Sequence, residues 1–451
     1  MTHLLVRVAV VLAVVSVWAV SARQASEPLA FVNVNVVPMD SERVLARQTV
    51  VVQQDRIVAV GPADKVQVPA GAKRIDAAGK YLMPGLAEMH GHLGSQEEMN
   101  LRILELNVLK GITTIRSMLG HPSHLPLRER VRKGEVLGPA IYTSGPSFNG
   151  NSAKTPEAAV QMVKEQKAAG YDFLKMHPGV PLASFEALVK AGREVGIMPQ
   201  GHVPAEVGLA RALAAPYPAI DHLDGYVEAL AGWTPGPNAP DPGFFGFKVA
   251  DKADESRIAS LVAETRKAKT VMVPTETVIH TFFSEEAPEK TVEQPQMRYV
   301  PKALRDNWVK QKTGFNDSHG LGTPEQRKHF FELRRRLIKA LHDGGVPILL
   351  GADSPQVFSV PGFATHQELA HLVAAGLTPY QALAAGTKNV AAFLETDGGT
   401  VEQGKRADLV LLEANPLERV ENASRIAGVV VGGRWIGPEE IASRLKALET
   451  P

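Results

Sequence analysis

Short apolar runs that alternate with longer amphipathic stretches are the feature of this sequence that most restricts its fold. A strand that is buried on both faces reads as a short continuous apolar run, and helices between such strands build parallel βαβ units. Eight such runs follow one another between residues 84 and 393. They lie at residues 85–90, 112–117, 140–144, 172–176, 197–202, 219–223, 270–275 and 347–352.

The number of runs predicts the architecture. Eight parallel strands, each followed by a helix, close into a (β/α)8 barrel, and residues 84–393 have the usual length of such a barrel. Helical stretches such as 156–169, 183–195 and 324–343 separate the runs. We therefore expect an α/β fold with a TIM-like (β/α)8 barrel at residues 84–393. The alternative that the residues leave open is an open, doubly wound sheet.

The segments on either side of the predicted barrel have the pattern of β structure. Residues 23–83 contain Val-rich alternating runs and a hairpin with a polar turn, and two further strand-like runs and a short terminal helix follow residue 394. Because the two segments flank the barrel in the sequence, we expect residues 23–83 and 394–451 to pair as one small β-sandwich.

Two segments do not fit a minimal barrel. Residues 231–247 are rich in Pro, Gly and Phe, and residues 281–323 carry Glu, Pro, Arg and aromatic residues without clean periodicity. Long loops in a compact domain are usually functional or disordered. Since both segments follow predicted barrel strands, we expect them to lie over the catalytic face.

The first residues have the pattern of a targeting segment. Arg7 gives a positive start, residues 8–19 are apolar, and Val20-Ser21-Ala22 offers small residues at a cleavage point. We expect a signal peptide at residues 1–22, and hence a periplasmic or secreted protein. The alternative is an uncleaved N-terminal anchor. No other stretch is long and apolar enough to cross a bilayer.

Composition excludes several classes of function. The chain has no cysteine, which excludes disulfides, cysteine-based zinc sites and thiol catalysis. Its 49 Lys and Arg residues balance 48 Asp and Glu residues, so no net field favours nucleic acid or an anionic membrane. Any metal must therefore be held by His, Asp, Glu or Lys side chains.

Polar residues stand at the C-terminal ends of the predicted strands, where barrel enzymes carry their chemistry. The first strand ends in His90 and His92, which lie on one face of a strand and can share one cation. The other candidates end the fourth, fifth, sixth and eighth strands: Lys175, His202, His222 and Asp353.

Each of these residues alone has an ordinary structural explanation, such as a hydrogen-bonded histidine, a snorkelling lysine or a helix N-cap. Polar groups crowded at one end of a barrel, however, carry a desolvation cost that a divalent cation would offset.

In combination, these motifs resemble the amidohydrolase superfamily, in particular its imidazolonepropionase-like branch of exported, metal-dependent dipeptidases and amidases of the prolidase-like kind. The resemblance covers nearly the whole chain after the predicted signal peptide. It rests on Pro84-Gly85-Leu86 with His90-x-His92, residues 111–116, Leu127-Arg128 to Gly145-Pro146, Lys175, His202, His222, and residues 351–354, 377–383 and 404–409. One departure is Glu88, where the family often has Asp; we expect Glu88 to contact groups around the metal ligands.

The resemblance implies a barrel with a flanking β-sandwich and one or two divalent metal ions. The implied ligands are His90, His92 and Asp353 for the first metal, His202 and His222 for the second, and Lys175 for both. Lys175 would be carboxylated, because a carbamate offers the oxygen donors that an ammonium group lacks. Histidine and carboxylate ligands suit zinc, although manganese or cobalt could replace it.

The chemistry that this metal set implies is hydrolysis. Two metals lower the pKa of a bridging water, so that a metal-bridged hydroxide exists near neutral pH. Asp353 would act as the general base for that hydroxide and then as the general acid for the leaving amine.

Substrate contacts are predicted for three further residues. Tyr226 could donate to the substrate carbonyl oxygen, and Arg116 could bind a substrate carboxylate. His366 follows the eighth strand, and for it a contact with the groups around the metal ligands or a helix-capping role is preferred to a substrate contact. We expect His121 and His177 to be structural or solvated.

The predicted function is hydrolysis of an amide or peptide bond in a small substrate such as a dipeptide or an N-acyl amino acid. Two alternatives stay open. One is a mononuclear cyclic amidohydrolase or deaminase that acts on a nitrogen heterocycle, with a structural Lys175. The other is a non-catalytic binding protein. The expected partner is a small molecule, with no nucleic acid and no membrane after signal cleavage; a homo-oligomer is compatible with the sequence.

Overall fold

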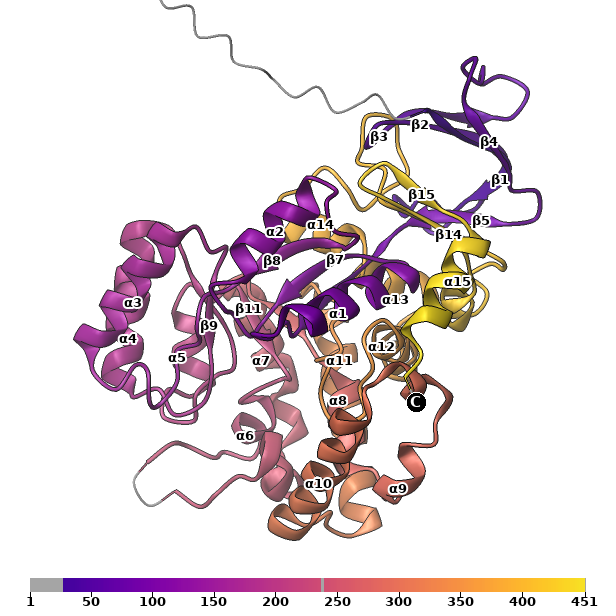
Figure 1. Ribbon diagram of the computed structural model, residues 1–451. Coiled ribbons are helices and arrows are strands. Elements are labelled where there is room, and N and C mark those ends of the chain that lie inside the picture. Colours follow the sequence, from indigo (N-terminus) through magenta and orange to yellow (C-terminus); the bar gives the residue numbers. More distant parts are fainter. Residues whose placement is uncertain (1–26, 237–238, 451) are drawn as a thin grey trace, which may run out of the picture.

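The structure is a computed structural model that describes residues 27–236 and 239–450 (Figure 1). The predicted signal peptide at residues 1–22 lies outside these residues. Within them, no helix combines the length and the apolar character that crossing a bilayer requires.

Two parallel sheets form the centre of a mixed α/β fold. Their seven strands fall within or overlap the first seven predicted runs, which confirms those strands. The first sheet contains β6 (Leu86–Gly91), β7 (Ile112–Ser117) and β8 (Ala140–Thr143). The second contains β9 (Leu174–Met176), β10 (Pro199–Gly201), β11 (Ala219–Asp221) and β12 (Val271–Val273).

The eighth predicted run, residues 347–352, is not a regular strand, although it occupies the place of one. Ile348 forms a parallel bridge with Met272 of β12, and the backbone N–H of Met89 in β6 donates to the Leu350 carbonyl at 2.8 Å. On the other side of the fold, a parallel bridge from Ser144 to Phe173 connects β8 with β9. Hydrogen bonds therefore connect the two parallel sheets at both of their borders.

Helices connect the parallel strands, and three of them match the predicted stretches closely: α3, α4 and α11. Helix α3 begins at the Thr155 cap, whose side chain accepts from the Ala158 N–H, and it ends at Gly170 with a φ of 86°. The helices are α1 (Glu97–Leu109), α2 (His124–Arg132), α3 (Pro156–Ala169), α4 (Leu182–Val195), α5 (Leu209–Ala214), α6 (Tyr226–Leu230), α7 (Ile258–Ala268), α8 (Glu276–Phe283), α9 (Pro288–Thr291), α10 (Lys302–His319), α11 (Pro324–Asp343), α12 (Phe363–Ala374), α13 (Pro379–Ala385), α14 (Lys388–Phe393) and α15 (Pro438–Leu448). Short 3₁₀ segments are η1 (Phe244–Lys252), η2 (Glu255–Arg257), η3 (Pro295–Tyr299) and η4 (Val420–Ser424).

The two ends of the described chain share one further sheet, whose order is β15-β14-β13-β5-β1-β2-β3, with β4 beside β1. Strand β13 pairs antiparallel with β5, so that Val410 lies opposite Met83. Figure 1 shows the indigo and yellow strands side by side at one end of the molecule. The strands are β1 (Leu29–Val36), β2 (Leu45–Gln53), β3 (Arg56–Pro62), β4 (Lys73–Asp76), β5 (Tyr81–Pro84), β13 (Leu409–Leu412), β14 (Ile426–Val431) and β15 (Arg434–Ile436). The domain limits on either side of residues 84–393 stay a prediction.

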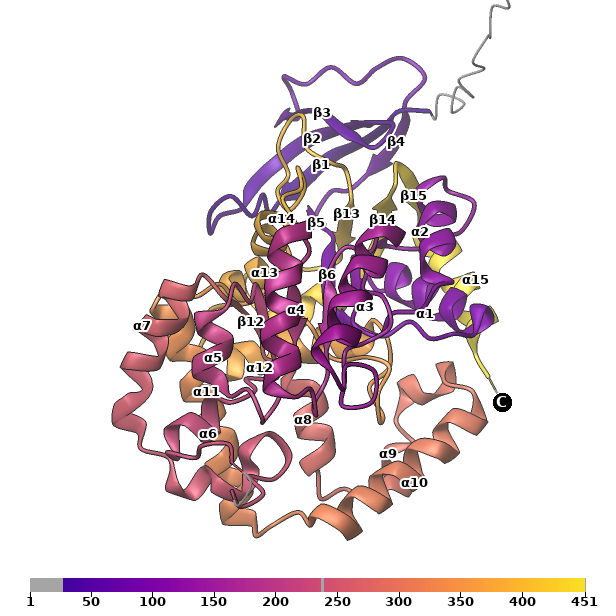
Figure 2. The same ribbon diagram turned by 90° about the vertical axis from the view of Figure 1, so that its left-hand side faces the viewer.

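The direction of the parallel strands fixes where their ends lie. Strand β6 begins directly after β5 of the terminal sheet, so its C-terminal end points away from that sheet. In Figures 1 and 2, α6, α9 and α10 lie at this far end, and Figure 2 shows α9 and α10 crossing beneath it. The two long inserted segments therefore lie at the end of the strands where the candidate ligands stand.

Candidate active site

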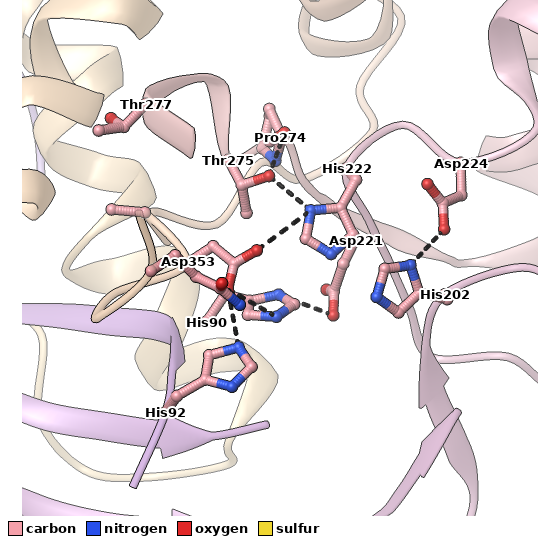
Figure 3. Close-up of polar contacts among 12 residues, drawn as sticks. His90, His92, His202, Asp221, His222, Asp224, Pro274, Thr275, Thr277 and Asp353 are labelled. Carbon is pink, nitrogen blue, oxygen red and sulfur yellow. Dashed lines mark hydrogen bonds and ion pairs between the residues drawn. The ribbon is translucent and has the colours of Figure 1, made fainter. Parts of the chain in front are cut away.

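Four histidines from three strand ends stand ring to ring (Figure 3). The ring centroids of His90 and His92 are 5.2 Å apart, those of His90 and His222 are 4.6 Å apart, and those of His202 and His222 are 4.5 Å apart. His90 and His222 are almost completely buried. The structure thus brings all four predicted histidines together.

Asp353 faces the same cluster. Its Oδ1 lies 2.7 Å from Nε2 of His92 and 3.7 Å from Nε2 of His90, and its Oδ2 lies 3.9 Å from Nδ1 of His222. Burial alone would raise the pKa of Asp353, but His90 and His92 outweigh burial and hold the pKa below its usual range. One ligand atom each from His90, His222 and Asp353 lies within 4.8 Å of the others, close enough to hold one metal ion.

The backbone at the cluster is strained. Asp353 has a φ of 60°, His222 a φ of 63° and Thr275 a φ of 54°, in the left-handed region that costs non-glycine residues about 1–3 kcal/mol each. Such conformations persist where the surrounding structure holds them, and they concentrate at functional sites. Here they turn the side chains of His222 and Asp353 toward each other.

Several buried polar atoms of the cluster have no hydrogen-bond partner. Buried polar groups are normally paired, since an unpaired one carries a desolvation cost. Burial also lowers the pKa values of His90 and His222 well below their usual range, which leaves neutral imidazoles with lone pairs for a metal. This donor set of imidazoles and carboxylates therefore fits a divalent cation. The atoms without a hydrogen bond are Nδ1 of His90, Nε2 of His92, Nζ of Lys175, Oδ2 of Asp221 and Nε2 of His222. Two of the imidazole atoms nevertheless face carboxylates, Nδ1 of His90 at 3.0 Å from Asp221 and Nε2 of His92 at 2.7 Å from Asp353.

Lys175 is fully buried beside these residues. Its Nζ lies 3.6 Å from Oδ2 of Asp221, and burial lowers the pKa of the lysine. Gly201, with a φ of 114°, passes directly beside it, and a Cβ atom at this position would lie 3.0 Å from the lysine Nζ. A glycine at position 201 thus keeps space free next to the amine.

Second residues orient the histidines. His202 contacts Oδ2 of Asp224 through Nδ1 at 2.7 Å, and Nδ1 of His222 lies 2.7 Å from Oγ1 of Thr275. The Thr275 hydroxyl donates to the Pro274 carbonyl, so it accepts from the His222 N–H. Both contacts leave Nε2 of each ring for a metal, as is usual for metal-binding histidines.

Glu88 contacts the backbone around the ligands, as expected. Its Oε1 accepts hydrogen bonds from the N–H groups of His90 at 2.9 Å and Ala352 at 2.8 Å, and its Oε2 accepts from the Thr365 hydroxyl at 2.7 Å. Burial raises the pKa of Glu88 to about 7. The glutamate therefore ties β6 to the segment that carries Asp353.

The structure corrects the predicted substrate contacts. Arg116 is fully buried, and it donates to the Met89 carbonyl, to Oε1 of Gln200 and to Oδ1 of Asp221. Tyr226 is also fully buried, with its hydroxyl 2.6 Å from that of Thr265. Neither polar group is free for a substrate, so the prediction is wrong for both.

The three other histidines considered in the sequence, His366, His121 and His177, lie outside the cluster. His366 lies against the Lys110 carbonyl at 2.9 Å and so caps the end of α1, which is the capping alternative. His121 contacts the nearby Ser123 hydroxyl. His177 is half-buried beside the cluster, with its ring 5.3 Å from that of His202.

Asp221 is the site residue that sequence reasoning missed. Its Oδ2 lies 3.0 Å from Nδ1 of His90, and its Oδ1 accepts from Arg116 at 3.0 Å. Neighbouring residues of a regular strand point to opposite faces, so Asp221 and His222 would not both face the site in one. The positive φ of His222 breaks that alternation. The only signal for Asp221 in the sequence is that it directly precedes His222.

A second buried network, of Arg334, Glu276 and Glu368, contacts the backbone of the cluster at His222. Arg334 of α11 donates to the His222 carbonyl at 2.9 Å and to Oε1 of Glu276 at 2.7 Å. Glu368 of α12 accepts from the backbone N–H groups of Glu276 and Thr277. Burial, with Glu276 nearby, raises the pKa of Glu368 to about 8.

This pKa predicts a pH dependence of stability. Between pH 4.5 and about 8 the folded chain keeps a proton on Glu368 that the unfolded chain releases, so the free energy of unfolding falls as the pH rises through this range. The slope from this one group reaches about 1.4 kcal/mol per pH unit. We expect Glu368→Gln to remove that contribution, measured as the wild-type minus variant difference in urea unfolding across the range. A constant difference would show that Glu368 is ionised in the folded protein.

Comparison with known proteins agrees with this fold. No curated protein matches the sequence. The structure is similar to a candidate prolidase from Bifidobacterium longum, with 24% identity and a TM-score of 0.65 over 94% of this chain and 99% of that chain. It is also similar to bottromycin amidohydrolase, with 21% identity and a TM-score of 0.67 over 93% and 90% of the two chains. A Xaa-Pro dipeptidase with bound methionine gives 18% identity and a TM-score of 0.63 over 91% and 100%.

The family assignment follows from the sequence. A model of the amidohydrolase family matches residues 81–436, from the last strand before the parallel sheets to the strand before the final helix. Members of this family generally use divalent metals, and the group formed by His90, His222 and Asp353 could hold such an ion. The chain therefore belongs to the amidohydrolase family, and it is an enzyme that hydrolyses carbon–nitrogen bonds.

Proposed function

We propose that this protein is an exported, binuclear-metal amidohydrolase that cleaves the amide or peptide bond of a dipeptide or an N-acyl amino acid. The observation that carries the proposal is the set of unpaired buried atoms at the strand ends, which includes the amine of Lys175. The similar structures described as a prolidase and a Xaa-Pro dipeptidase support the substrate class. Export rests on the signal-peptide pattern alone.

The fold proposed for this site is a closed (β/α)8 barrel. The parallel bridges from Ser144 to Phe173 and from Met272 to Ile348 support closure, as does the bridge from Gly91 to Ser354. Closure would place all the candidate ligands in one ring at the C-terminal ends of the strands.

The proposed ligands are those that the family resemblance implies. His90, His92 and Asp353 would hold one metal, and His202 and His222 the other, with zinc favoured by these donors. Carboxylated Lys175 would supply an oxygen ligand to both. The buried amine with its lowered pKa suits carbamate formation, since only a neutral amine attacks carbon dioxide, and Gly201 leaves room beside it.

The residues around the proposed metals would have separate roles in the reaction. When bound, the metals would polarise the scissile carbonyl and lower the pKa of a water molecule. Asp353, held ionised by its histidine neighbours, takes the proton of the attacking water and delivers it to the leaving amine. Asp224 and Thr275 keep His202 and His222 in the tautomers that leave Nε2 free. Glu88 holds Ala352, and with it Asp353, against β6.

A mononuclear cyclic amidohydrolase or deaminase is the second candidate. The three-residue group of His90, His222 and Asp353 favours it, because these ligand atoms already lie close enough for one ion. In that case Lys175 would remain an amine and pair with Asp221.

Purified wild-type protein tests the proposal in a hydrolysis screen over dipeptides and N-acyl amino acids, with metal content measured on the same preparation. We expect dipeptide or N-acyl hydrolysis, two metal ions per chain and a carbamate on Lys175. One tightly bound ion with unmodified Lys175 would refute the binuclear version. Ring hydrolysis or ammonia release without dipeptide turnover would favour the second candidate.

A purified Lys175→Ala variant tests the same proposal by site-directed substitution. We expect the metal content to fall to one ion per chain and activity to fall with it, because the shared oxygen ligand is lost. Propionate, whose carboxylate can enter the vacated space, should restore part of both. Lys388→Met is the control, since Lys388 is a half-buried lysine that donates to the Tyr380 hydroxyl, which in turn contacts the Met39 carbonyl beside the terminal sheet. Unchanged metal content in Lys175→Ala would contradict the ligand role.

A further inference from the structure

A continuous group of phenylalanines begins at the candidate metal centre. The ring of Phe245 lies 5.1 Å from that of His222. Phe244 stands 4.2 Å from Phe245, 5.0 Å from Phe282 and 5.1 Å from Phe315. We refer to Phe244, Phe245, Phe282 and Phe315 as the aromatic wall.

The wall is built from the two inserted segments. Phe244 and Phe245 follow residues 231–243, and Phe282 and Phe315 belong to α8 and α10. Phe315 is buried, whereas Phe244, Phe245 and Phe282 stay half-buried. Within the described residues, every ring contact of Phe244 and Phe245 is to another phenylalanine or to a histidine. The wall is therefore a continuous group of aromatic rings, three of them partly exposed, that begins at a ring contact with His222.

The backbone holds Phe245 in place against its own preference. Phe245 has a φ of 54°, in the left-handed region where a bulky side chain is strained. The next residue, Gly246, packs tightly against α6, because a Cβ atom there would lie 2.8 Å from Cβ of Val227. A strained aromatic residue fixed over a candidate ligand indicates a functional position.

We propose that the aromatic wall is the subsite for a substrate side chain, and that the enzyme prefers substrates with an aromatic or long aliphatic side chain next to the scissile amide. This inference rests on the proposed function. Aromatic rings favour apolar partners and aromatic edges, and a charged side chain would lose its hydration against them. Because the Phe245 ring contacts the ring of His222, the wall begins directly beside a candidate metal ligand.

The test compares kcat/KM over two dipeptide series, one varied on each side of the scissile bond, with the variable residue phenylalanine, leucine, alanine, aspartate or lysine. We expect wild-type enzyme to favour phenylalanine and leucine over aspartate and lysine by about tenfold or more in one series. Phe245→Ala should lower the phenylalanine-to-alanine ratio of kcat/KM by about tenfold, and Phe245→Leu should keep most of it. Phe363→Ala, which removes a half-buried ring that stacks on Tyr299, is the matched control and should leave the ratio unchanged.

The outcomes separate this inference from the proposed function. Hydrolysis of both series without a preference, or with a preference for charged residues, would overturn the subsite while leaving the dipeptidase activity intact. A wild-type preference that survives in Phe245→Ala would also overturn it. No hydrolysis by the metal-loaded wild type of either dipeptide series or of the matching N-acyl amino acids would refute the proposed function, and the subsite that rests on it would fall with it. The wild-type series gives its answer even if a variant fails to fold.

Discussion

An Asp353→Asn variant is expected to lose about three orders of magnitude in kcat while keeping its fold. A positioned acid or base contributes about 10²–10⁴-fold to a rate, and the carboxamide can neither accept the proton of water nor return it to the leaving amine. Asparagine has nearly the same shape, and it tolerates the left-handed backbone that Asp353 adopts. The loss should therefore appear in turnover, measured on the best substrate of the screen, while the far-UV circular dichroism spectrum stays that of the wild type.

The control for this variant is Asp172→Asn. Asp172 is more exposed and accepts from the Thr143 backbone N–H at 2.8 Å and from Arg128 at 2.9 Å, and it stands just before β9, at the opposite end of the strands from Asp353. It should keep wild-type turnover. Full activity in Asp353→Asn would show that Asp353 is not the general base and that the proposed mechanism is wrong.

An Arg334→Met variant is expected to lose about 3–5 kcal/mol of the free energy of unfolding. Removing one partner of a buried ion pair leaves the other charge without compensation. Arg334 is fully buried, donates through Nε and Nη2 to Glu276, and also binds the His222 carbonyl. The variant would leave the Glu276 carboxylate buried beside Glu368, which urea unfolding at neutral pH would report as a lower midpoint.

Two further variants isolate the cause. Arg336→Met removes an arginine of the same helix whose pair with Glu255 is solvent-exposed, and such pairs contribute about 0–1 kcal/mol. Adding Glu276→Gln to Arg334→Met should recover part of the loss, because the unpaired charge is then gone. A loss in Arg334→Met no larger than that in Arg336→Met would exclude the buried pair as a major source of stability.

The sequence predicted the parallel strands well, because strands buried on both faces leave continuous apolar runs that turns and helices separate. It also predicted which residues meet at the strand ends, since parallel strands bring their C-terminal ends together. The eighth run was the exception, because it forms no regular strand. Gly351 stands in that run, and a Cβ atom there would lie 2.7 Å from the His90 backbone nitrogen, so close packing against β6 takes precedence over ideal pairing.

The roles of individual polar residues were harder to predict, because they depend on backbone conformations that sequence alone does not reveal. Arg116 ends a strand as a substrate-binding arginine would, yet its guanidinium is used inside the fold by Asp221 and Gln200. Tyr226 follows His222 by only four residues, but the positive φ values of His222 and Leu223 turn the chain, and the tyrosine packs under α7. The phenylalanines of the inserted segments had no periodicity that could place them.

The position of β13 between β5 and β14 has a consequence for biosynthesis. During translation, β5 emerges early but must wait for the last part of the chain before its edge is covered. A ribosome-bound or truncated chain therefore exposes an unpaired strand edge, which is a template for aggregation. Pairing between such distant segments is slow, because the entropy cost of closing the long intervening loop arises before the stabilising contacts form. The terminal sheet thus makes completion of the fold conditional on synthesis of residues 409–436, and chains that end before residue 409 should be recovered as aggregates.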